Sequence, residues 1–134
     1  ARDGRIETAA SAIDAVRDVL AELPEPPKPQ RLALLQAQAT LAEARGDSEA
    51  RLQRRREALA LVESLHAEGH PRRARAQLAL AEAEAAAGDL DSARARLVAA
   101  TPLLRATLHP SSPALAQLSA LSTRLASPQA GRAR

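Results

Sequence analysis

The 134-residue chain contains no cysteine, methionine, phenylalanine, tyrosine or tryptophan. Without cysteine it has no disulfide, no thiol nucleophile and no thiolate ligand for zinc or an iron–sulfur cluster. Valine and isoleucine are also scarce, with four and two copies. Because strands recruit β-branched and aromatic side chains, this composition argues against a β-rich fold.

Alanine, leucine and arginine dominate instead, with 34, 21 and 18 copies, a profile typical of long helices and helical repeats. No apolar run approaches the ~18 residues that a membrane span needs, and no secretory signal opens the sequence. We therefore expect a cytoplasmic chain with no membrane partner. Because the first residue is not methionine, we also expect it to be part of a longer protein.

The charges are unevenly distributed along the chain. The formal net charge is +3, from 19 basic and 16 acidic residues. Residues 1–91 hold all 16 acids and 13 of the bases, whereas residues 92–134 hold six arginines and no acid. A basic C-terminal third attracts acidic peptides, acidic protein surfaces or nucleic acid through its long-range field. An ordinary solvated surface is the alternative, and the sequence leaves both open.

Glycine and proline recur with one period. Three of the five glycines are 42 residues apart, at Gly4, Gly46 and Gly88. Three of the nine prolines have the same spacing, at Pro29, Pro71 and Pro113. Because these residues punctuate helical chains, the spacing predicts a helical repeat. We expect one domain, residues 1–126, made of units 4–45, 46–87 and 88–126, and a disordered tail, 127–134.

The pattern predicts an all-α fold of about six helices, at 5–23, 30–45, 48–66, 72–87, 90–108 and 114–126. Asp47 and Asp89 follow turn glycines and are candidate N-caps. Each repeated proline stands where a helix begins, a position at which its missing N–H is harmless. Pro102 falls inside the fifth helix, and it predicts a kink there or a helix that ends a turn early.

The segment 88–100, Gly-Asp-Leu-Asp-Ser-Ala-Arg-Ala-Arg-Leu-Val-Ala-Ala, resembles the turn and second helix of a tetratricopeptide repeat. That family has a small, an apolar and a second small residue at the positions of Ala93, Leu97 and Ala100. The first unit has residues similar in kind, at Ala9, Ile13 and Val16. The middle unit keeps Ala58 but has arginines at the first two positions, Arg51 and Arg55.

The 42-residue period resembles the kinesin-light-chain type of tetratricopeptide repeat, whose second helix ends in a His-Pro motif. Similar pairs occur here at His70-Pro71 and His109-Pro110. The first helices depart from the family, because alanine and leucine replace its aromatic and glycine landmarks. The resemblance implies a right-handed superhelical solenoid of antiparallel helix pairs. It also implies a protein–protein interaction module or scaffold, of the kind often attached to bacterial regulatory proteins.

The resemblance further implies a concave groove that binds a peptide or a partner helix. It is lined by the first helix of each pair, and its polar residues here are Gln36, Thr40, Glu43, Arg75, Glu82, Gln117 and Arg124. Such side chains can hold the backbone or a carboxylate of an extended peptide. The alternative is that they form the solvated stripe of amphipathic helices.

The sequence holds no recognisable catalytic, metal or cofactor motif. His66 and His70 are four residues apart, but Gly69 and Pro71 place them in a loop and no third ligand is evident. Arginine clusters would suit phosphate, yet nucleic-acid modules usually add stacking aromatics, which this chain lacks. We therefore expect a non-enzymatic protein without a cofactor. The alternatives are a self-associating helical array, forming a homo-oligomer, and a basic-surface binder of nucleic acid or acidic protein.

Overall fold

The computed structural model describes residues 2–126, which form six α-helices and no strand. The helices are α1 (Arg2–Ala21), α2 (Lys28–Ala44), α3 (Ser48–Leu65), α4 (Pro71–Ala86), α5 (Leu90–Thr107) and α6 (Pro113–Ala126). Every helix end lies within three residues of its expected place, so the all-α prediction is confirmed. The predicted disordered tail lies outside the described residues.

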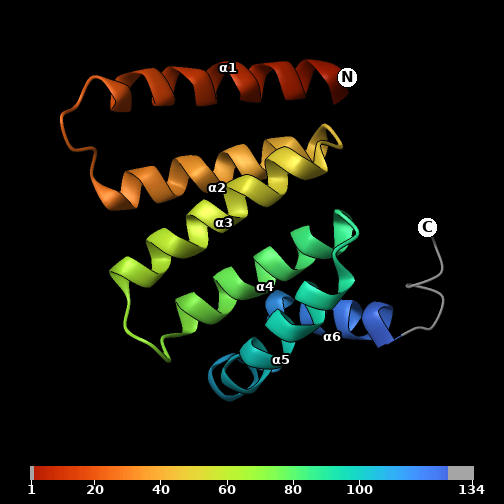
Figure 1. The fold of residues 1–134 in the computed structure, drawn as a ribbon. Helices are drawn as coiled ribbons and strands as arrows, with labels where there is room; N and C mark the ends of the chain where they lie inside the picture. Colours follow the sequence, from red (N-terminus) through yellow and green to blue (C-terminus); the bar gives the residue numbers. More distant parts are fainter. Residues whose placement is uncertain (1, 127–134) are drawn as a thin grey trace.

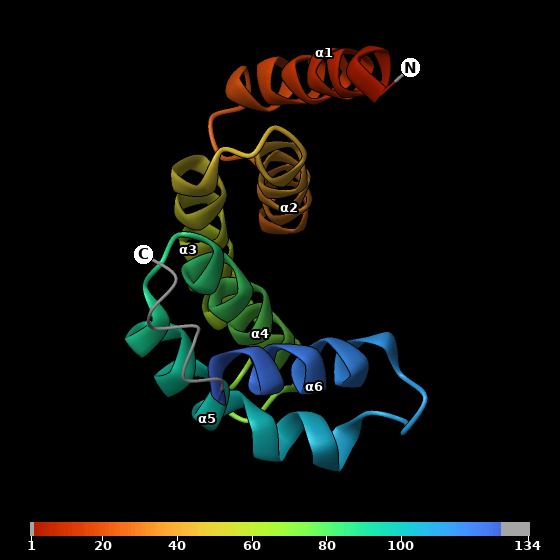
Figure 2. The same cartoon turned by 90° about the vertical axis from the view of Figure 1, so that its right-hand side faces the viewer.

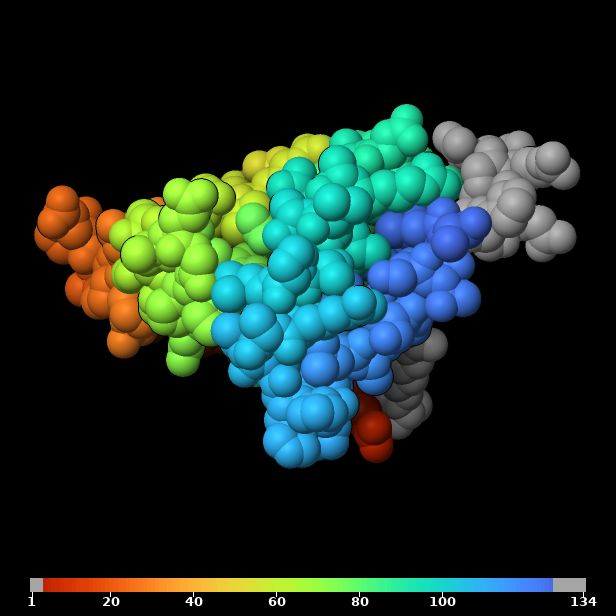
Figure 3. All heavy atoms as spheres, turned by 90° about the horizontal axis from the view of Figure 1, so that it is seen from below, coloured from red at the N-terminus to blue at the C-terminus, as the bar shows by residue number. Residues whose placement is uncertain are grey.

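Consecutive helices run antiparallel and follow one another through space (Figure 1). The most extensive packing is between α4 and α5 and between α2 and α3, and α3 also packs against α4. α1 contacts α2, while α6 contacts both α5 and α4. The space-filling view of Figure 3 shows α5 and α6 side by side. α1 and α6 therefore lie at opposite ends of the helix array (Figures 1 and 2).

Two of the turns are built alike. In the α2–α3 turn, Gly46 has a φ of +70°, which glycine adopts without steric penalty. The N–H of Asp47 donates to the carbonyl oxygen of Ala42 at 2.9 Å and closes a Schellman motif. The Asp47 carboxylate then caps α3 by accepting a backbone N–H. Gly88 and Asp89 repeat this arrangement before α5, so both predicted N-caps are confirmed.

Gly4 does not form a third copy of this turn. The sequence pattern predicts a helix that starts after it, but α1 begins at Arg2 and contains Gly4. A turn glycine takes a positive φ in order to close the C-terminus of the preceding helix. No helix precedes Gly4 among residues 2–126, so nothing requires that conformation there.

The three prolines of the repeat mark helix starts, whereas Pro102 lies inside a helix. The three repeated prolines all stand in the first turn of a helix, at Pro29, Pro71 and Pro113. Pro102 lies inside α5, which continues through it to Thr107. The helix therefore does not end early. Figure 2 shows instead that the second half of α5 runs in a different direction from the first, as a missing backbone hydrogen bond to Val98 allows.

The largest apolar core lies where α4, α5 and α6 meet. Five alanines at the crossing of α4 and α5 are no more than 3% exposed: Ala74, Ala81 and Ala85 from α4, and Ala93 and Ala100 from α5. Because their side chains are short, the two helices approach closely. Leucines from all three helices fill the space around them, among them Leu78, Leu97, Leu104 and Leu118. A smaller cluster joins α3 to α4 through Leu52, Leu59, Leu80 and Ala83.

One ion pair is part of this interface. The Glu84 side chain on α4 is only 2% exposed. Its two carboxylate oxygens accept from Nε and Nη2 of Arg96 on α5, at 2.8 and 3.0 Å. The hydrogen bond to Glu84 raises the pKa of Arg96. A two-point contact of this kind fixes the register of α5 on α4 as well as adding energy.

Replacing Arg96 with methionine leaves the Glu84 carboxylate buried without its cation. We expect Arg96→Met to lower the free energy of unfolding by about 2–3 kcal/mol, less than for a fully buried pair because Arg96 is 31% exposed. Chemical denaturation followed by circular dichroism measures this. The exposed Arg105→Met should cost no more than about 0.5 kcal/mol. Equal losses in the two variants would contradict a structural role for the pair.

Candidate functional site

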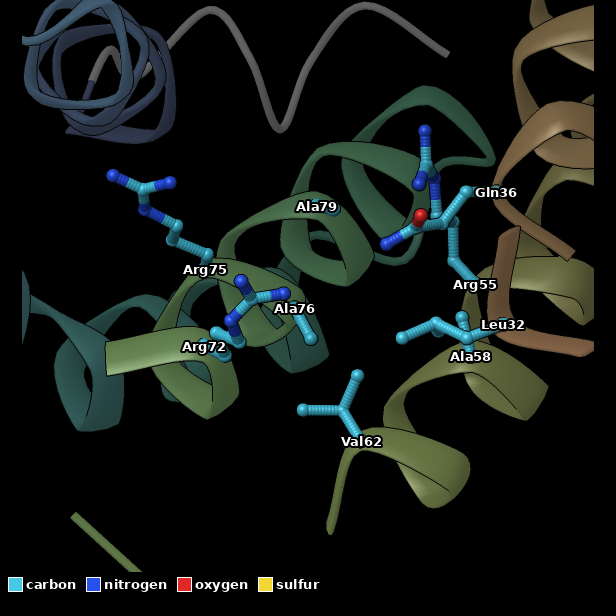
Figure 4. Close-up of a pocket in the computed structure, with 9 residues that line it drawn as sticks. All are labelled: Leu32, Gln36, Arg55, Ala58, Val62, Arg72, Arg75, Ala76 and Ala79. Atoms are coloured by element: carbon cyan, nitrogen blue, oxygen red, sulfur yellow. The ribbon is translucent and has the colours of Figure 1, made fainter. Parts of the chain in front are cut away.

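Two hollows lie along one face of α4, and we refer to them together as the groove. The first, the arginine hollow, has a volume of about 270 Å³. It is lined by Leu32, Gln36, Arg55, Ala58, Val62, Arg72, Arg75, Ala76 and Ala79 (Figure 4). The second, the mixed-charge hollow, has a volume of about 330 Å³. It is lined by Glu43, Arg51, Glu82, Gln117, Ala120, Leu121 and Arg124.

The α4 residues that line the groove recur every three or four positions from Arg72 to Glu82, so they share one side of the helix. α2 and α3 form one wall of both hollows, and α6 forms a wall of the mixed-charge hollow alone. In Figure 4, Arg55 rises from α3, while Arg72 and Arg75 rise from α4. The groove is therefore assembled from helices of successive units of the repeat.

Two arginines of α3 occupy positions that are apolar in the other units. Arg51 and Arg55 lie on the face of α3 where α5 carries buried Ala93 and Leu97. Both are partly buried, and the Nε of each is buried without an acceptor among the described residues. Arg51 reaches Glu43 at 3.7 Å. An unmet buried donor is costly, so packing alone does not account for these two side chains.

Partial burial shifts the pKa values of two charged side chains in the groove, Arg55 and Glu82. Burial lowers the pKa of Arg55, and the positive charge of Arg51 lowers it further. The carboxylates of Glu43 and Glu82 act in the opposite direction on the pKa of Arg55, with smaller effects. Burial also raises the pKa of Glu82, although Arg51 opposes this. An anion beside Arg55 would therefore supply an attraction that the groove itself provides only weakly.

The arginine hollow differs from other basic parts of the surface in lacking carboxylates. Arg55, Arg72 and Arg75 form no ion pair with any carboxylate in the described part of the chain. By contrast, their neighbour Arg73 pairs with Glu63 at 3.4 Å. Three arginines thus line one hollow, and no carboxylate of the described residues lies within salt-bridge distance of them.

The structure brings most of the predicted groove residues to this surface. Gln36 and Arg75 line the arginine hollow, and four others line the mixed-charge hollow: Glu43, Glu82, Gln117 and Arg124. Thr40 lies apart from both. It lines a cleft between α1 and α2, and its hydroxyl donates to the carbonyl oxygen of Gln36 at 3.0 Å.

Three charged residues of the groove were not predicted, namely Arg51, Arg55 and Arg72. Arg51 and Arg55 do leave a signal in the sequence, because they interrupt a repeat that is otherwise apolar at those positions. A charge that replaces a core residue indicates that the helix faces a partly solvated space there. Arg72 carries no comparable signal, since it stands in an ordinary first turn.

The histidines at the α3–α4 loop form a stacked pair. The rings of His66 and His70 are 4.2 Å apart, and His70 caps α4 by accepting the N–H of Arg72 at its Nδ1. Burial lowers the pKa of His66, and His70 and Arg72 lower it further. Within residues 2–126 no group of three or more histidine or acidic side chains is placed to hold a metal ion.

No protein-family model, curated protein or solved structure matches this chain. None of the helices in the described range is both long and apolar enough to cross a membrane.

The raised pKa of Glu82 predicts how the free energy of unfolding depends on pH. The folded protein holds a proton on Glu82 at pH values where an unfolded glutamate, with a pKa of 4.5, has lost it. The contribution of Glu82 to stability therefore falls as pH rises through this window and stays low above it. Glu82→Gln should be at least as stable as the parent at pH 7, and the difference should vanish below pH 4.5. Denaturation curves across this range measure it.

The exposed loop residue Glu68 offers the matched control, and Glu68→Gln should change the free energy of unfolding at pH 7 by no more than about 0.5 kcal/mol. A Glu82→Gln variant that is less stable than the parent at pH 7 would contradict the prediction. It would mean that the attraction between Glu82 and Arg51 outweighs the cost of burying the carboxylate.

Proposed function

We propose that this chain is a non-catalytic protein-interaction module of the tetratricopeptide type that binds an acidic peptide segment in its groove. The 42-residue period, the antiparallel helix pairs and the two matching Gly-Asp turns support a repeat of this type. Stacked pairs of this kind form a right-handed superhelical solenoid, since each pair buries an apolar face that it cannot bury alone. As a regulatory or docking region, the module would serve a larger bacterial cytoplasmic protein.

The main support for the proposal is that the three arginines of the arginine hollow form no ion pair with a carboxylate of the described residues. Arg55, Arg72 and Arg75 come from two helices and line the same hollow. Apolar atoms of Leu32, Ala58 and Val62 line the same hollow. A carboxylate entering it would gain charge-assisted hydrogen bonds from planar guanidinium groups in a partly desolvated setting.

The length of the groove suits a short extended segment. From Arg72 to Glu82 the helix rises about 15 Å, which spans roughly five extended residues. One end offers only cations, while the mixed-charge hollow offers two carboxylates, two guanidinium groups and the amide of Gln117. A peptide with an acidic residue at one end and polar backbone contacts at the other would match both hollows.

The same cations would also attract phosphate, but two features favour a peptide over nucleic acid. Glu43 and Glu82 lie in the mixed-charge hollow and would repel a continuous phosphate backbone. The chain also has no phenylalanine, tyrosine or tryptophan on which a base could stack.

The test uses a capped, fluorescent peptide of alternating glutamate and alanine, about ten residues long and so longer than the groove. We expect the chain to bind it in a fluorescence anisotropy titration. Arg72→Glu/Arg75→Glu should weaken binding by about tenfold or more, because each change turns an attraction into a repulsion. The same peptide with glutamine in place of glutamate should bind far less tightly.

The matched control is Arg56→Glu/Arg105→Glu, which changes the net charge equally at two exposed residues that line neither hollow. It should bind the acidic peptide nearly as well as the parent. Equal loss in both double variants would show diffuse attraction and defeat the groove assignment. Displacement of the peptide by low concentrations of oligodeoxythymidine would favour the nucleic-acid alternative.

A further inference from the structure

An apolar hollow lies beside the groove, in a cleft between α1 and α2, and shares Gln36 with the arginine hollow. Its volume is about 640 Å³. It is lined mainly by Ile6, Ala9, Ala12 and Ile13 of α1 and by Ala37, Leu41 and Ala44 of α2. The apolar surface of α1 continues past the cleft, where Val16 and Val19 are 48% and 62% exposed. Leu20 is the single buried residue of α1 over residues 4–21.

The 42-residue repeat allows this surface of α1 to be compared with the equivalent surface of α5. Moving two periods along the chain takes Ala9, Ile13, Val16 and Leu20 to Ala93, Leu97, Ala100 and Leu104 of α5. All four α5 residues are buried in the core that α5 shares with α4. This face of α1, on which Ala9 and Val16 are exposed, Ile13 is half-buried and Leu20 is buried, thus corresponds to the face with which α5 binds α4. No helix lies over it among the described residues, because α1 packs mainly on α2.

The other end of the array has the complementary surface. One period takes three core residues of α4, Ala74, Leu78 and Ala81, to Ala116, Ala120 and Thr123 of α6. These three α6 residues are exposed, whereas the opposite side of α6 is buried through Leu118, Leu121 and Leu125. α6 therefore leaves exposed the face that α4 uses to hold α5, and Ala120 at its edge also lines the mixed-charge hollow.

Charge favours the same pairing. Over residues 4–22, which cover α1 and the residue that follows it, four acids are exposed: Glu7, Asp14 and Asp18 in the helix and Glu22 directly after it. The same stretch has two arginines, Arg5 and Arg17. From residue 92 to the end of α6 the chain has four arginines and no acid. An acidic first helix and a basic last region attract each other, whereas two first helices repel.

We infer that two copies of this chain associate head to tail, with α6 of one copy lying in the α1–α2 cleft of the next. α1 and α6 stand at opposite ends of the array, so one copy cannot make this contact with itself (Figures 1 and 2). The pair formed by α6 and the neighbouring α1 reproduces the α4–α5 pair and continues the repeat. Such a contact does not close on itself, so the assembly grows into longer chains with concentration. The inference does not depend on the proposed peptide ligand.

Two blocked variants test the geometry by sedimentation velocity. Val16→Asp/Val19→Asp blocks the α1 face, and Ala116→Glu/Ala120→Glu blocks the α6 face. From about 10 μM to 1 mM, a range that covers weak specific association, the parent chain should form dimers and larger species. Each blocked variant alone should remain a monomer. An equimolar mixture of the two should form a 1:1 dimer that grows no further, because each supplies the face that the other lacks.

This mixture also shows that both variants are folded, since a misfolded chain would not restore binding. Val98→Asp is the matched control, because Val98 is 74% exposed and lines neither face. It should associate like the parent. A monomeric parent chain at 1 mM would overturn the inference. So would an α6-blocked variant that still dimerises alone, which would indicate pairing between two α1 faces, or a mixture that stays monomeric.

Discussion

The close crossing of α4 and α5 is the contact from which the rest of the structure follows. Five buried alanines allow the two helices to approach, and Glu84 with Arg96 sets their register. The core of α6 and the walls of the groove are positioned by α4 in turn. A chain without phenylalanine, tyrosine or tryptophan has few bulky side chains to fill a wide gap between helices. A close-packed core then requires helices that cross at short distances.

This constraint also explains where the charges lie. At the alanine-lined crossing, a buried acid is tolerated because Arg96 meets both of its oxygens. Where α3 carries Arg51 and Arg55 instead of alanine and leucine, the helices cannot close in the same way, and a groove remains. The departure of the middle unit from the repeat thus coincides with the two hollows, since Arg55 lines one and Arg51 the other. The surface proposed for recognition is also the place where the repeat pattern of packing is broken.

The helices and their turns could be predicted because their signals are local. Gly46, Asp47 and Pro71 act within a few residues of themselves, and the 42-residue period shows them more than once. Most predicted groove residues also lie in the two hollows, since helical spacing determines which residues share a face. Thr40 and Arg72 were beyond such reasoning. Whether they face the groove depends on the tilt of α2 and α4 against their neighbours, which no short segment encodes.

Burial is uneven along the array, and α1 contributes a single buried residue over 4–21. In a stacked repeat, the stability of each helix comes from its own propensity and from its immediate neighbours. α1 has one such neighbour, so its amides should exchange with solvent at a much lower opening free energy than those of α4 or α5. Local stability should therefore decrease from α4 and α5 toward α1. A contact that covers α1 would raise the stability of that helix as well as holding the partner. It would draw a loosely held helix into the cooperative unit.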